Sequence, residues 1–490
     1  MPDSYTPSPS DPQGPLAKIP DRFEEIRTPE PEARPEEIRT PEEAIEVLNR
    51  ARSVTSEDEI ACAFAKKYAG RLVFDHTQQN WFVWTGARWQ RDEKDSVFSL
   101  ARDFCRFVRT RDNPRESPKS MAKIAFVTAI VRAARSDPLL AVVNEIWDRD
   151  PWLLGVPGGV IDLRTGSTTL PDAARFISRE TSIAPAPPGT RAPIWERFLV
   201  EATGGDMDFV CFLQRFCGYL LTGLVNEEIV AFFYGPGGNG KGTFLRPISQ
   251  ILHEYAGSIP IEVFSEGGRI NLEYYRAQMN GRRLITTLEP ESGAHWSESS
   301  LKEISGNETA LSARHPYGRP FQFMPTCKIV AVGNYAPKLK TRSPAMERRL
   351  RVCPFNHAPP KPDLNLKERL ITEHPGILRW MIDGALTLQR DGLGSCAAVR
   401  AASEHYFAAM DSFAEWIDDC CVIDSSLSSA PAALLGSFNG WAKAGGRDLL
   451  DAVAFAEIIE RTPGLTRTRA HGKRLVRGIG LRAPTGGYDP

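Results

Sequence analysis

The chain of 490 residues has no long apolar run, no secretory leader pattern and no closely spaced cysteine pair. A membrane-spanning helix needs about 18 or more apolar residues in a row, and no stretch approaches that length. The N-terminus has no apolar segment of the signal-peptide type. Its nine cysteines form no C-x-x-C pair, and the odd number argues against a secreted disulfide framework. These absences predict a protein of the reducing cytoplasm, with buried thiols and no membrane partner.

A strong net charge is also missing. Lys and Arg number 60 and Asp and Glu number 61, so the net charge of −1 does not by itself indicate nucleic-acid binding. The charges are unevenly placed, because residues 1–50 carry twelve acidic and six basic side chains, whereas residues 461–490 carry seven Lys or Arg and one Asp. This asymmetry predicts a basic surface at the C-terminal end.

The N-terminal segment, residues 1–55, has the composition of a disordered Pro/Glu-rich tail. Ten prolines fall in the first fifty positions, and EEIRTPE occurs at 24–30 and again at 36–42. Such a segment buries too little apolar surface to offset its chain entropy. Two polar copies are too few for a solenoid, so a partner-docking motif is the alternative.

The next region, residues 56–200, predicts an α+β domain. A helix is expected at 58–68, a β-meander at 71–92, helices through Trp147, a strand–turn–strand unit at 151–166 and a linker at 184–193. Trp81, Trp84 and Trp89 lie on the meander. Aromatic residues on strands more often fill a core than stack on bases, and both interpretations stay open here. A helical stretch is expected from Trp195 to Thr222.

Residues 229–243, IVAFFYGPGGNGKGT, are the most informative stretch of the chain. An apolar run, a glycine-rich turn and a helix-compatible segment form the strand–loop–helix context of a phosphate-binding loop. Glycines let backbone N–H groups converge on phosphate oxygens, and the helix N-terminus and Lys241 add positive charge. The alternative is a surface turn ending in a solvated lysine. The predicted nucleotide-binding residues are Gly235, Pro236, Gly237, Gly238, Asn239, Gly240, Lys241, Gly242 and Thr243.

Two acids follow a second predicted strand, residues 284–288. Glu289 stands at its carboxyl end and Glu291 is two residues on. Because open α/β sheets place their chemistry at the carboxyl ends of strands, a carboxylate here can orient metal-bound water or accept its proton. Gly242 occupies the place of the usual Mg²⁺-binding hydroxyl, so the predicted metal ligands are Thr243 and Glu289. A solvated pair of acids is the alternative.

A third predicted strand, residues 327–334, ends in Asn334, whose amide can sense a γ-phosphate or hold the attacking water. Lys241 and Glu289 are 48 residues apart, and Glu289 and Asn334 are 45 apart, so each gap accommodates a strand–helix–strand unit. Taken alone, an asparagine at this place would more often be a turn residue.

Arg348 and Arg349 precede a further apolar strand. An arginine that reaches the γ-phosphate of a neighbouring subunit stabilises transition-state charge, and such a site exists only in an oligomer that closes into a ring. The alternative is a pair of arginines that snorkel at the start of a strand.

A hairpin is predicted between the second and third strands, after a short helix at 299–304 that Gly306 can cap. The segments ALSARHP and RPFQF flank Tyr317 and Gly318. Basic and aromatic residues at the tip suit phosphate contact and base stacking, although an ordinary surface hairpin is the alternative. The predicted contacts are Arg314, His315, Tyr317 and Arg319.

With these pieces in order, the chain resembles the superfamily-three helicases, and in particular the C-terminal helicase part of the phage/plasmid primase family, related to the poxvirus helicase-primase. The resemblance rests on N-G-K-G-T at 239–243, E-P-E at 289–291, N-Y-A-P at 334–337, and paired arginines before a strand ending in Pro354-Phe355. It extends to WLLGVPGGVIDLRTG at 152–166 and to residues 399–421, and it covers roughly 56–482.

The resemblance implies an α/β fold whose AAA+-like superfamily-three core, with a parallel sheet, occupies residues 201–360. An α+β helicase-associated domain precedes it at 56–200. A helical region and a winged-helix-like DNA-binding domain follow at 361–490. The family often carries a primase domain ahead of the helicase. Here only the tail of residues 1–55 precedes the helicase region, so priming by this chain is not expected. The resemblance also implies a bacterial host cell. The basic residues expected at the C-terminal DNA contact are Arg467, Arg469, Lys473 and Arg474.

The leading hypothesis is an ATP-dependent, ring-forming DNA helicase that replicates a phage, prophage or plasmid. Its cofactors would be ATP and Mg²⁺. Its DNA partners would be a single strand in the ring pore and duplex at the C-terminal domain. It would form a homo-hexamer and work with a separate primase or polymerase. The rival is an ATP-dependent DNA-binding switch without unwinding, such as an origin-recognition or accessory protein. A small-molecule kinase is disfavoured by the hairpin and the paired arginines. The expected catalytic residues are Lys241, Glu289, Glu291, Asn334, Arg348 and Arg349.

Overall fold

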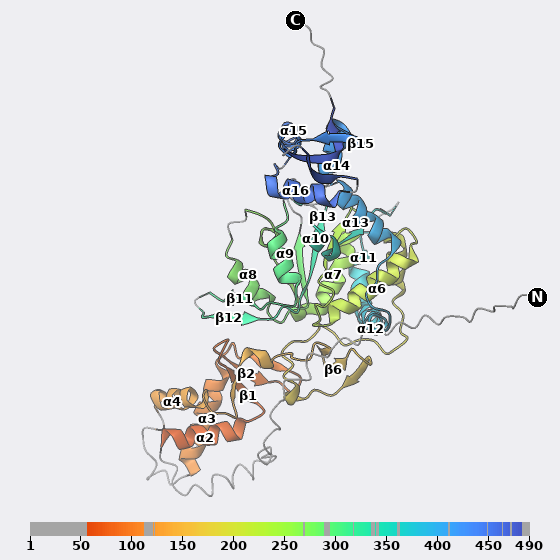
Figure 1. Cartoon of the computed structure of the whole chain (residues 1–490). Coiled ribbons are helices and arrows are strands. Elements are labelled where there is room, and N and C mark those ends of the chain that lie inside the picture. The colour runs from red at the N-terminus through yellow and green to blue at the C-terminus, as the bar shows by residue number, and fades with distance from the viewer. Residues whose placement is uncertain are drawn as a thin grey trace, which may run out of the picture.

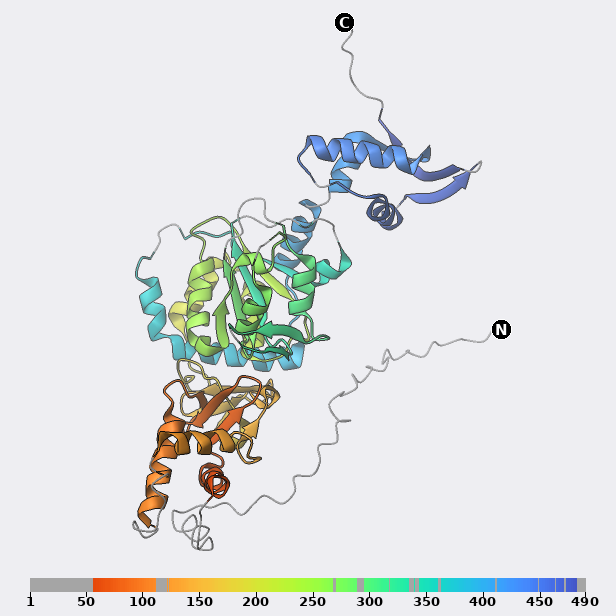
Figure 2. The ribbon, with the colours of Figure 1, turned by 90° about the vertical axis from the view of Figure 1, so that its left-hand side faces the viewer.

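The computed structural model describes residues 56–482 except 112–120, 122, 268–269, 289–294, 317, 335–338, 340–342, 360–362, 410–411, 448, 463 and 471–472. The expected N-terminal tail lies outside these residues. A head, a central α/β domain and a C-terminal domain follow one another in space (Figures 1 and 2). Within the part described, no helix has the length and apolar character to cross a bilayer. The same residues contain no group of three His, Cys, Asp or Glu placed to hold a metal.

The head, residues 56–148, begins with a capped helix. Ser56 and Glu59 form a capping box, with the Glu59 amide 3.2 Å from Ser56 Oγ and the Ser56 amide 3.1 Å from Glu59 Oε2. The predicted β-meander is confirmed, because its three strands pair in sequence order as an antiparallel sheet. The elements are α2 (Glu57–Tyr68), β1 (Leu72–Asp75), β2 (Asn80–Trp84), β3 (Trp89–Arg91), α3 (Ser96–Arg111) and α4 (Ile124–Ala134).

The expectation of helix through Trp147 is wrong for its last part. Helix α4 ends at Ala134, and β4 (Ala141–Val142) then pairs with β1 in the parallel direction. Asp137 and Pro138 are turn-forming residues that break the helical pattern. The indole of Trp147 then donates to Asp75 Oδ2 at 2.6 Å, which fastens the end of the head to β1.

The tryptophans of the meander belong to the core. Trp81 is 8% and Trp89 1% exposed, and Trp84 is half-buried. Trp89 stacks nearly parallel on Phe176, with ring centroids 5.7 Å apart. The core interpretation is therefore confirmed, and Trp89 also joins the head to the chain that follows it.

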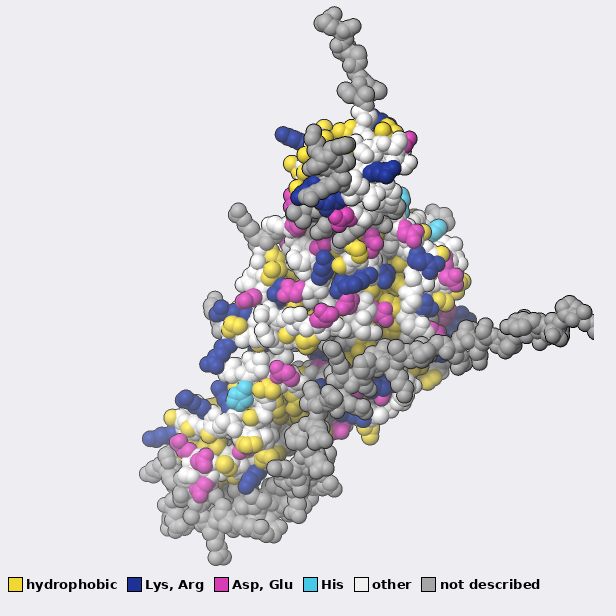
Figure 3. Space-filling view, in the orientation of Figure 1, with side chains coloured by type: hydrophobic (Ala, Val, Ile, Leu, Met, Phe, Trp, Pro, Cys, Tyr) yellow, Lys and Arg dark blue, Asp and Glu magenta, His cyan; other side chains and the backbone are white. Residues whose placement is uncertain are grey.

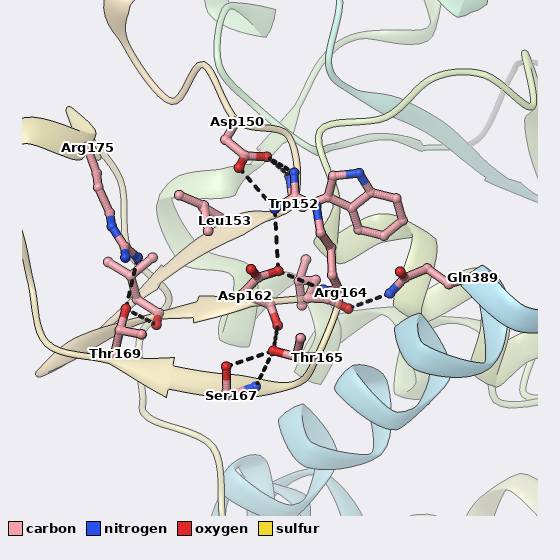
Figure 4. A network of polar contacts seen from close by, with 12 residues as sticks. Asp150, Trp152, Leu153, Asp162, Arg164, Thr165, Ser167, Thr169, Arg175 and Gln389 are labelled. Atoms are coloured by element: carbon pink, nitrogen blue, oxygen red, sulfur yellow. Dashed lines mark hydrogen bonds and ion pairs between the residues drawn. The ribbon is translucent and has the colours of Figure 1, made fainter. Parts of the chain in front are cut away.

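A small antiparallel sheet, residues 153–169, comes next and packs on the central domain. It is formed by β5 (Leu153–Val156), β6 (Gly159–Asp162) and β7 (Ser167–Thr169), so the predicted strand–turn–strand unit is confirmed. Arg164 binds both carboxylate oxygens of Asp150, at 2.8 and 3.0 Å, and Gln389 of α12 donates to the Leu163 carbonyl at 2.8 Å (Figure 4). Its apolar side chains share one core with the central sheet, so hydrophobic packing runs across the domain boundary expected at residue 200.

The central sheet has the strand order β14-β8-β13-β10-β9, and all its pairings are parallel. Helices cover both faces, and the strands are nearly continuous apolar runs, as expected for a doubly covered parallel sheet. The expected α/β class with a parallel sheet is confirmed. The strands are β8 (Val230–Tyr234), β9 (Ala256–Ser258), β10 (Leu284–Leu288), β13 (Lys328–Gly333) and β14 (Leu350–Pro354).

The helical stretch expected from Trp195 to Thr222 is two helices. Gly204 and Gly205 adopt positive φ values of 65° and 85°, and Asp206 caps the second helix through the Phe209 amide. One face of the sheet is covered by α5 (Pro193–Ala202), α6 (Met207–Leu221), α7 (Lys241–Leu252), α11 (Leu366–Thr372) and α12 (His374–Asp391). The other face packs with α8 (Leu272–Met279), α9 (Glu298–Ser305), α10 (Pro344–Arg349) and α13 (Ala397–Ala409).

The short helix and the hairpin predicted between the second and third strands are confirmed. Helix α9 is capped by Gly306, and β11 (Leu311–Arg314) pairs with β12 (Pro320–Phe323) in an antiparallel hairpin. The hairpin lies on the side of the central domain that faces the head (Figure 1). Its inward side chains, Leu311, Ala313, Phe321 and Phe323, are buried in the core of that face.

Two buried cations cap the carboxyl end of α6, where helix carbonyls are left without intrahelical partners. Arg283, which precedes β10, donates to the Leu221 carbonyl, and Lys328, the first residue of β13, donates to the Thr222 carbonyl. Burial lowers the pKa of both side chains, that of Lys328 strongly. The rings of Tyr255 and Tyr219 lie against the two cations, so the amino ends of two strands are fixed to one helix end.

The C-terminal domain, residues 412–482, has three helices and a three-stranded sheet of order β15-β17-β16. The basic segment at its end, which contains the residues expected at the C-terminal DNA contact, is a two-stranded antiparallel ribbon. Strand β15 was not expected, because its mostly exposed residues lack apolar alternation. The elements are α14 (Ser412–Cys420), β15 (Cys421–Ser429), α15 (Pro431–Ala444), α16 (Ala452–Arg461), β16 (Thr466–Ala470) and β17 (Lys473–Leu481).

The close crossing of α6 and α12 yields a stability prediction. A Cβ at Gly384 would collide with the Gln214 backbone, so Gly384→Ala forces the two helices apart. We expect a loss of about 1–3 kcal/mol in the free energy of unfolding, despite the better helix propensity of alanine. Urea denaturation followed by circular dichroism measures it.

Gly436→Ala is the matched control, because a Cβ at Gly436 on α15 meets nothing within 4 Å. That variant should be unchanged or stabilised by up to ~1 kcal/mol. Equal stabilisation of both variants would show that the helices do not depend on this close approach.

Candidate nucleotide-binding site

The glycine-rich loop joins the carboxyl end of β8 to the first turn of α7. Gly240 is the N-cap of α7 with φ +90°, and the Phe198 ring lies 3.1 Å from the place of its missing Cβ, closer than an ordinary van der Waals contact. Gly235 passes so close to the Phe355 carbonyl that any side chain there would collide. The loop therefore needs glycine at both places, once for backbone conformation and once for space.

The first turn of α7 offers backbone amides to the loop. The first main-chain hydrogen bond of the helix runs from the Phe244 amide to the Gly240 carbonyl, at 2.8 Å. The amides of residues 241–243 precede that bond, so by helix geometry they point toward the loop together with the positive end of the helix dipole. This is an arrangement that binds an anion.

The Lys241 side chain lies in the loop and is 6% exposed. Its Nζ donates to the Gly235 carbonyl at 2.6 Å, the Pro236 carbonyl at 3.2 Å and Asn239 Oδ1 at 3.0 Å. Nζ also donates to Asn334 Oδ1 at 2.9 Å. The ammonium group is thus positioned by neutral oxygens at the carboxyl edge of the sheet, and it carries a positive charge to whatever binds there.

The sheet brings Asn334 to Lys241 across 93 residues of sequence. Strand β13 lies beside β8, with Gly333 opposite Tyr234, so the residue after β13 reaches the loop that follows β8. The sequence predicted that these strand ends belong to one site, and the structure brings the two side chains into contact. Strand β10 ends at the same edge, with Leu288 opposite Val332. Glu289 and Glu291, the predicted acids, lie outside the described residues.

Asn239 joins the loop to β14. Its Nδ2 donates to the Phe355 carbonyl while its Oδ1 accepts from Lys241, and the side chain is buried. The Phe355 amide donates in turn to the Tyr234 carbonyl at 2.7 Å. The loop is therefore held by both neighbours of β8. Sequence reasoning placed Asn239 in the loop but missed this bridge, because nothing in the sequence shows that residue 355 lies beside residue 239.

Gly242 and Thr243 occupy the second and third positions of α7. A Cβ on Gly242 would meet nothing within 4 Å, so no packing reason explains the lack of a side chain there. Thr243 is half-buried one position further on. Among the described residues, the Thr243 hydroxyl is the oxygen ligand that this turn can offer to a metal such as Mg²⁺.

The two predicted arginines have different surroundings. Arg349 is buried, and its guanidinium pairs with the Glu228 carboxylate at the start of β8. Arg348 is exposed on the last turn of α10. Both precede β14, whose Leu350 lies opposite Val230, so they lie at the amino edge of the sheet. Five strand residues, roughly 16 Å, separate that edge from the carboxyl edge, where the glycine-rich loop lies.

Within this subunit Arg349 is therefore engaged in an ion pair, whereas Arg348 is exposed, and the finger role predicted for this pair of arginines stays a prediction. Sequence reasoning missed Glu228 as the partner of Arg349. The available signal was an acid directly before an apolar strand, which is too common to identify a partner.

The hairpin carries its predicted basic residues at its tip. Arg314 and Arg319 are exposed, and Arg314 Nε donates to the Gly318 carbonyl at 3.0 Å. The His315 ring stacks on Phe321 with centroids 5.3 Å apart. Partial burial lowers the pKa of His315, and the nearby Arg91 of the head lowers it further. Tyr317 lies outside the described residues.

The C-terminal ribbon contains the remaining predicted contacts. Arg467 is half-exposed and pairs with Glu460 of α16 at 2.5 Å, and Arg474 is exposed on β17. The backbone register places Arg469 opposite Arg474 and Ala470 opposite Lys473. The side chains of Arg469 and Lys473 are not among those described.

Comparison with known proteins supports the resemblance at a coarse level. Residues 61–204 match the family described as D5 N terminal like, and residues 233–349 match a family of unknown function, DUF5906. Over 137 residues, 28% of the chain, the sequence is 26% identical to a putative helicase, L207/L206, of Acanthamoeba polyphaga mimivirus. That alignment spans 14% of the length of the relative. Parts of the chain are thus similar to the D5 N terminal like family and to a viral putative helicase.

Solved structures similar to this one include two apo structures of the NrS-1 C terminal region. The A form has a TM-score of 0.49 at 12% identity, covering 84% of this chain and 96% of that one. Another apo structure of the region has a TM-score of 0.48 at 11% identity, with the same coverage.

The contrast between the two arginines is testable. Glu228→Gln removes the carboxylate that pairs with the buried Arg349, so we expect a loss of about 1–3 kcal/mol in the free energy of unfolding. Arg348→Gln changes an exposed side chain and should alter stability by no more than about 0.5 kcal/mol. Chemical denaturation of both variants checks this, and equal effects would contradict the assignment of Arg349 to a structural pair.

Proposed function

We propose that the chain is an ATP-dependent, ring-forming DNA helicase of the superfamily-three type, serving replication of a phage, prophage or plasmid. The observation that carries the proposal is the contact between Lys241 and Asn334 at the edge where β8 and β13 end. Nucleotide hydrolysis uses a lysine that binds the phosphates and a polar group that binds the γ-phosphate or orients the attacking water. Lys241 and Asn334 supply these two groups from neighbouring strands. The relationship to viral primase–helicase proteins supports the same reading.

ATP with Mg²⁺ is the proposed cofactor, because a buried cation, a glycine loop and a helix N-terminus together fit a polyphosphate. Lys241 and the amides of residues 235–243 would hold the phosphates. Thr243 and Glu289 would hold the metal, which neutralises charge and lowers the pKa of bound water. Glu289, with Glu291 beside it in sequence, would accept the proton of the attacking water, and Asn334 would orient that water.

The place of Arg348 supports a ring. At the amino edge of the sheet it is too far from its own phosphate loop to act there, whereas its exposure leaves it available to a neighbouring subunit. A head-to-tail contact of this kind repeats until it closes, and we propose a homo-hexamer. In such a ring the site is completed by Arg348 of the next subunit.

DNA is the proposed partner at two places. Hairpin residues Arg314, His315, Tyr317 and Arg319 would contact a single strand in the pore. The C-terminal domain, with its three helices and basic β16–β17 ribbon, has the make-up of a winged helix and would contact duplex. We assign priming to a separate primase or polymerase.

The deciding experiment is ATP-dependent unwinding of a forked DNA duplex, with Glu289→Gln beside the unchanged chain. We expect strand separation by the unchanged chain and its loss, by a factor of at least about 10², in the variant. Tight ATP-dependent DNA binding without separation would replace the helicase by the rival, a nucleotide-controlled DNA-binding switch.

A mixing experiment tests the ring. Lys241→Ala and Arg348→Ala should each abolish ATP turnover, because one loses the phosphate contact and the other the neighbour's charge. Mixed subunits should regain part of the turnover, since some interfaces then pair an intact Lys241 with an intact Arg348. Turnover by Arg348→Ala alone would remove this arginine from the site, and near-normal turnover by Lys241→Ala would overturn the site itself.

A further inference from the structure

A cleft of about 420 Å³ lies between the head and the central domain, on the side of the hairpin. This volume is in the range of sites for small ligands, about 300–1,000 Å³. Its walls come from three segments that are far apart in the sequence. They include Trp147 of the head and Arg149 just after it, Arg179 of the connecting segment, and Asn280, Gln322 and Met324 of the central domain.

The floor of the cleft is built from amides that join the two domains. Asn144 Oδ1 of the head accepts from Gln78 Nε2 at 3.0 Å and from Asn280 Nδ2 of the central domain at 3.1 Å. Asn144 is 9% exposed, so the network is held within the packed junction. Amides offer both donors and acceptors, which is the combination that reads the edge of a nucleobase.

Arg179 is fixed beside this floor. Its Nη1 donates to the Glu254 carbonyl at 3.0 Å and its Nη2 to the Asn280 carbonyl at 2.8 Å. Its Nε is buried and has no hydrogen-bond partner among the described residues. The terminal nitrogens are thus fixed by backbone carbonyls, and the guanidinium lines the cleft as a positive charge held in place.

The cleft continues the surface of the hairpin. Gln322 lies on β12 and Met324 directly follows it, while the opposite end of the same hairpin carries Arg314 and Arg319. Arg149 is exposed at the rim. Lys and Arg side chains also follow the edge of the molecule from the hairpin to the head (Figure 3). A strand that leaves the hairpin toward the head therefore meets further positive charge.

We propose that this cleft binds one nucleotide of the single-stranded DNA that the hairpin contacts. Arg149 and Arg179 face the phosphate, and Gln322 with the amide floor faces the base. The inference rests on the proposed function for the identity of its ligand. It adds a second contact within each subunit, so that the head holds the strand while the hairpin moves.

The test is fluorescence anisotropy of a labelled oligo-dT with the full chain, over a range of salt concentrations. Arg149→Ala should weaken binding about tenfold and reduce the slope of log affinity against log salt by about one, because one phosphate contact is lost. Gln322→Glu, which adds a negative charge at an exposed position, should weaken binding at least as much.

Two control variants accompany the test. Arg390→Ala removes the same charge from a side chain that is 74% exposed at the end of α12, and it should leave the affinity unchanged. Arg319→Ala on the hairpin should weaken binding independently of the cleft. Photo-crosslinking of 5-iodouracil-substituted DNA should additionally label peptides that contain Trp147 or Met324.

The outcomes separate the inference from the proposed function. If the unchanged chain binds single strands, and Arg149→Ala and Gln322→Glu bind equally well, the cleft inference is overturned while the helicase proposal stands. Crosslinks confined to the hairpin tip would have the same meaning. If the unchanged chain binds no single-stranded DNA with or without ATP, the proposed function fails and the cleft inference fails with it.

Discussion

The position of β8 between β13 and β14 in one parallel sheet is the constraint on which the candidate site depends. Because parallel strands end at the same edge, the loop after β8 meets Asn334 on one side and Phe355 on the other. Asn239 and Lys241 convert this adjacency into hydrogen bonds, so the loop is held from both sides. A change in strand order would separate residues that are 93 to 116 positions apart in sequence.

The two edges of the sheet carry different sets of charged and polar groups. The carboxyl edge gathers a cation, amides and a helix N-terminus, which together suit an anion. The amino edge gathers buried cations that are held within the fold. Arg283 and Lys328 donate to carbonyl groups at the end of α6, and Arg349 pairs with Glu228. These interactions fix the strand starts, and they leave the exposed Arg348 as the residue available to a neighbour. The head and the hairpin also meet at the amino edge, where the proposed contacts to single-stranded DNA lie.

Sequence patterns with a short period were interpreted correctly. The meander, the helix α9, the hairpin and the apolar strands of the central sheet follow from alternation, apolar runs and turn residues. Errors occurred where a local signal was weak or overridden. The sequence predicts one helix across Gly204–Gly205, where the structure has two. It predicts helix where β4 lies, and it contains no apolar pattern that predicts the exposed strand β15. The packing of residues 153–169 on the central core depends on contacts such as Gln389 with Leu163, which no local pattern records.

By itself, the sequence determined the glycine-rich loop with its lysine, the class of fold and the order of the polar residues that follow each strand, because these depend on neighbouring residues and on backbone preferences. Only the tertiary structure decided which of these residues meet. In the tertiary structure Lys241 contacts Asn334 and Arg349 pairs with Glu228. A cleft lies between the head and the hairpin. Such contacts are set by strand order and domain packing, and these are properties of the whole chain in three dimensions.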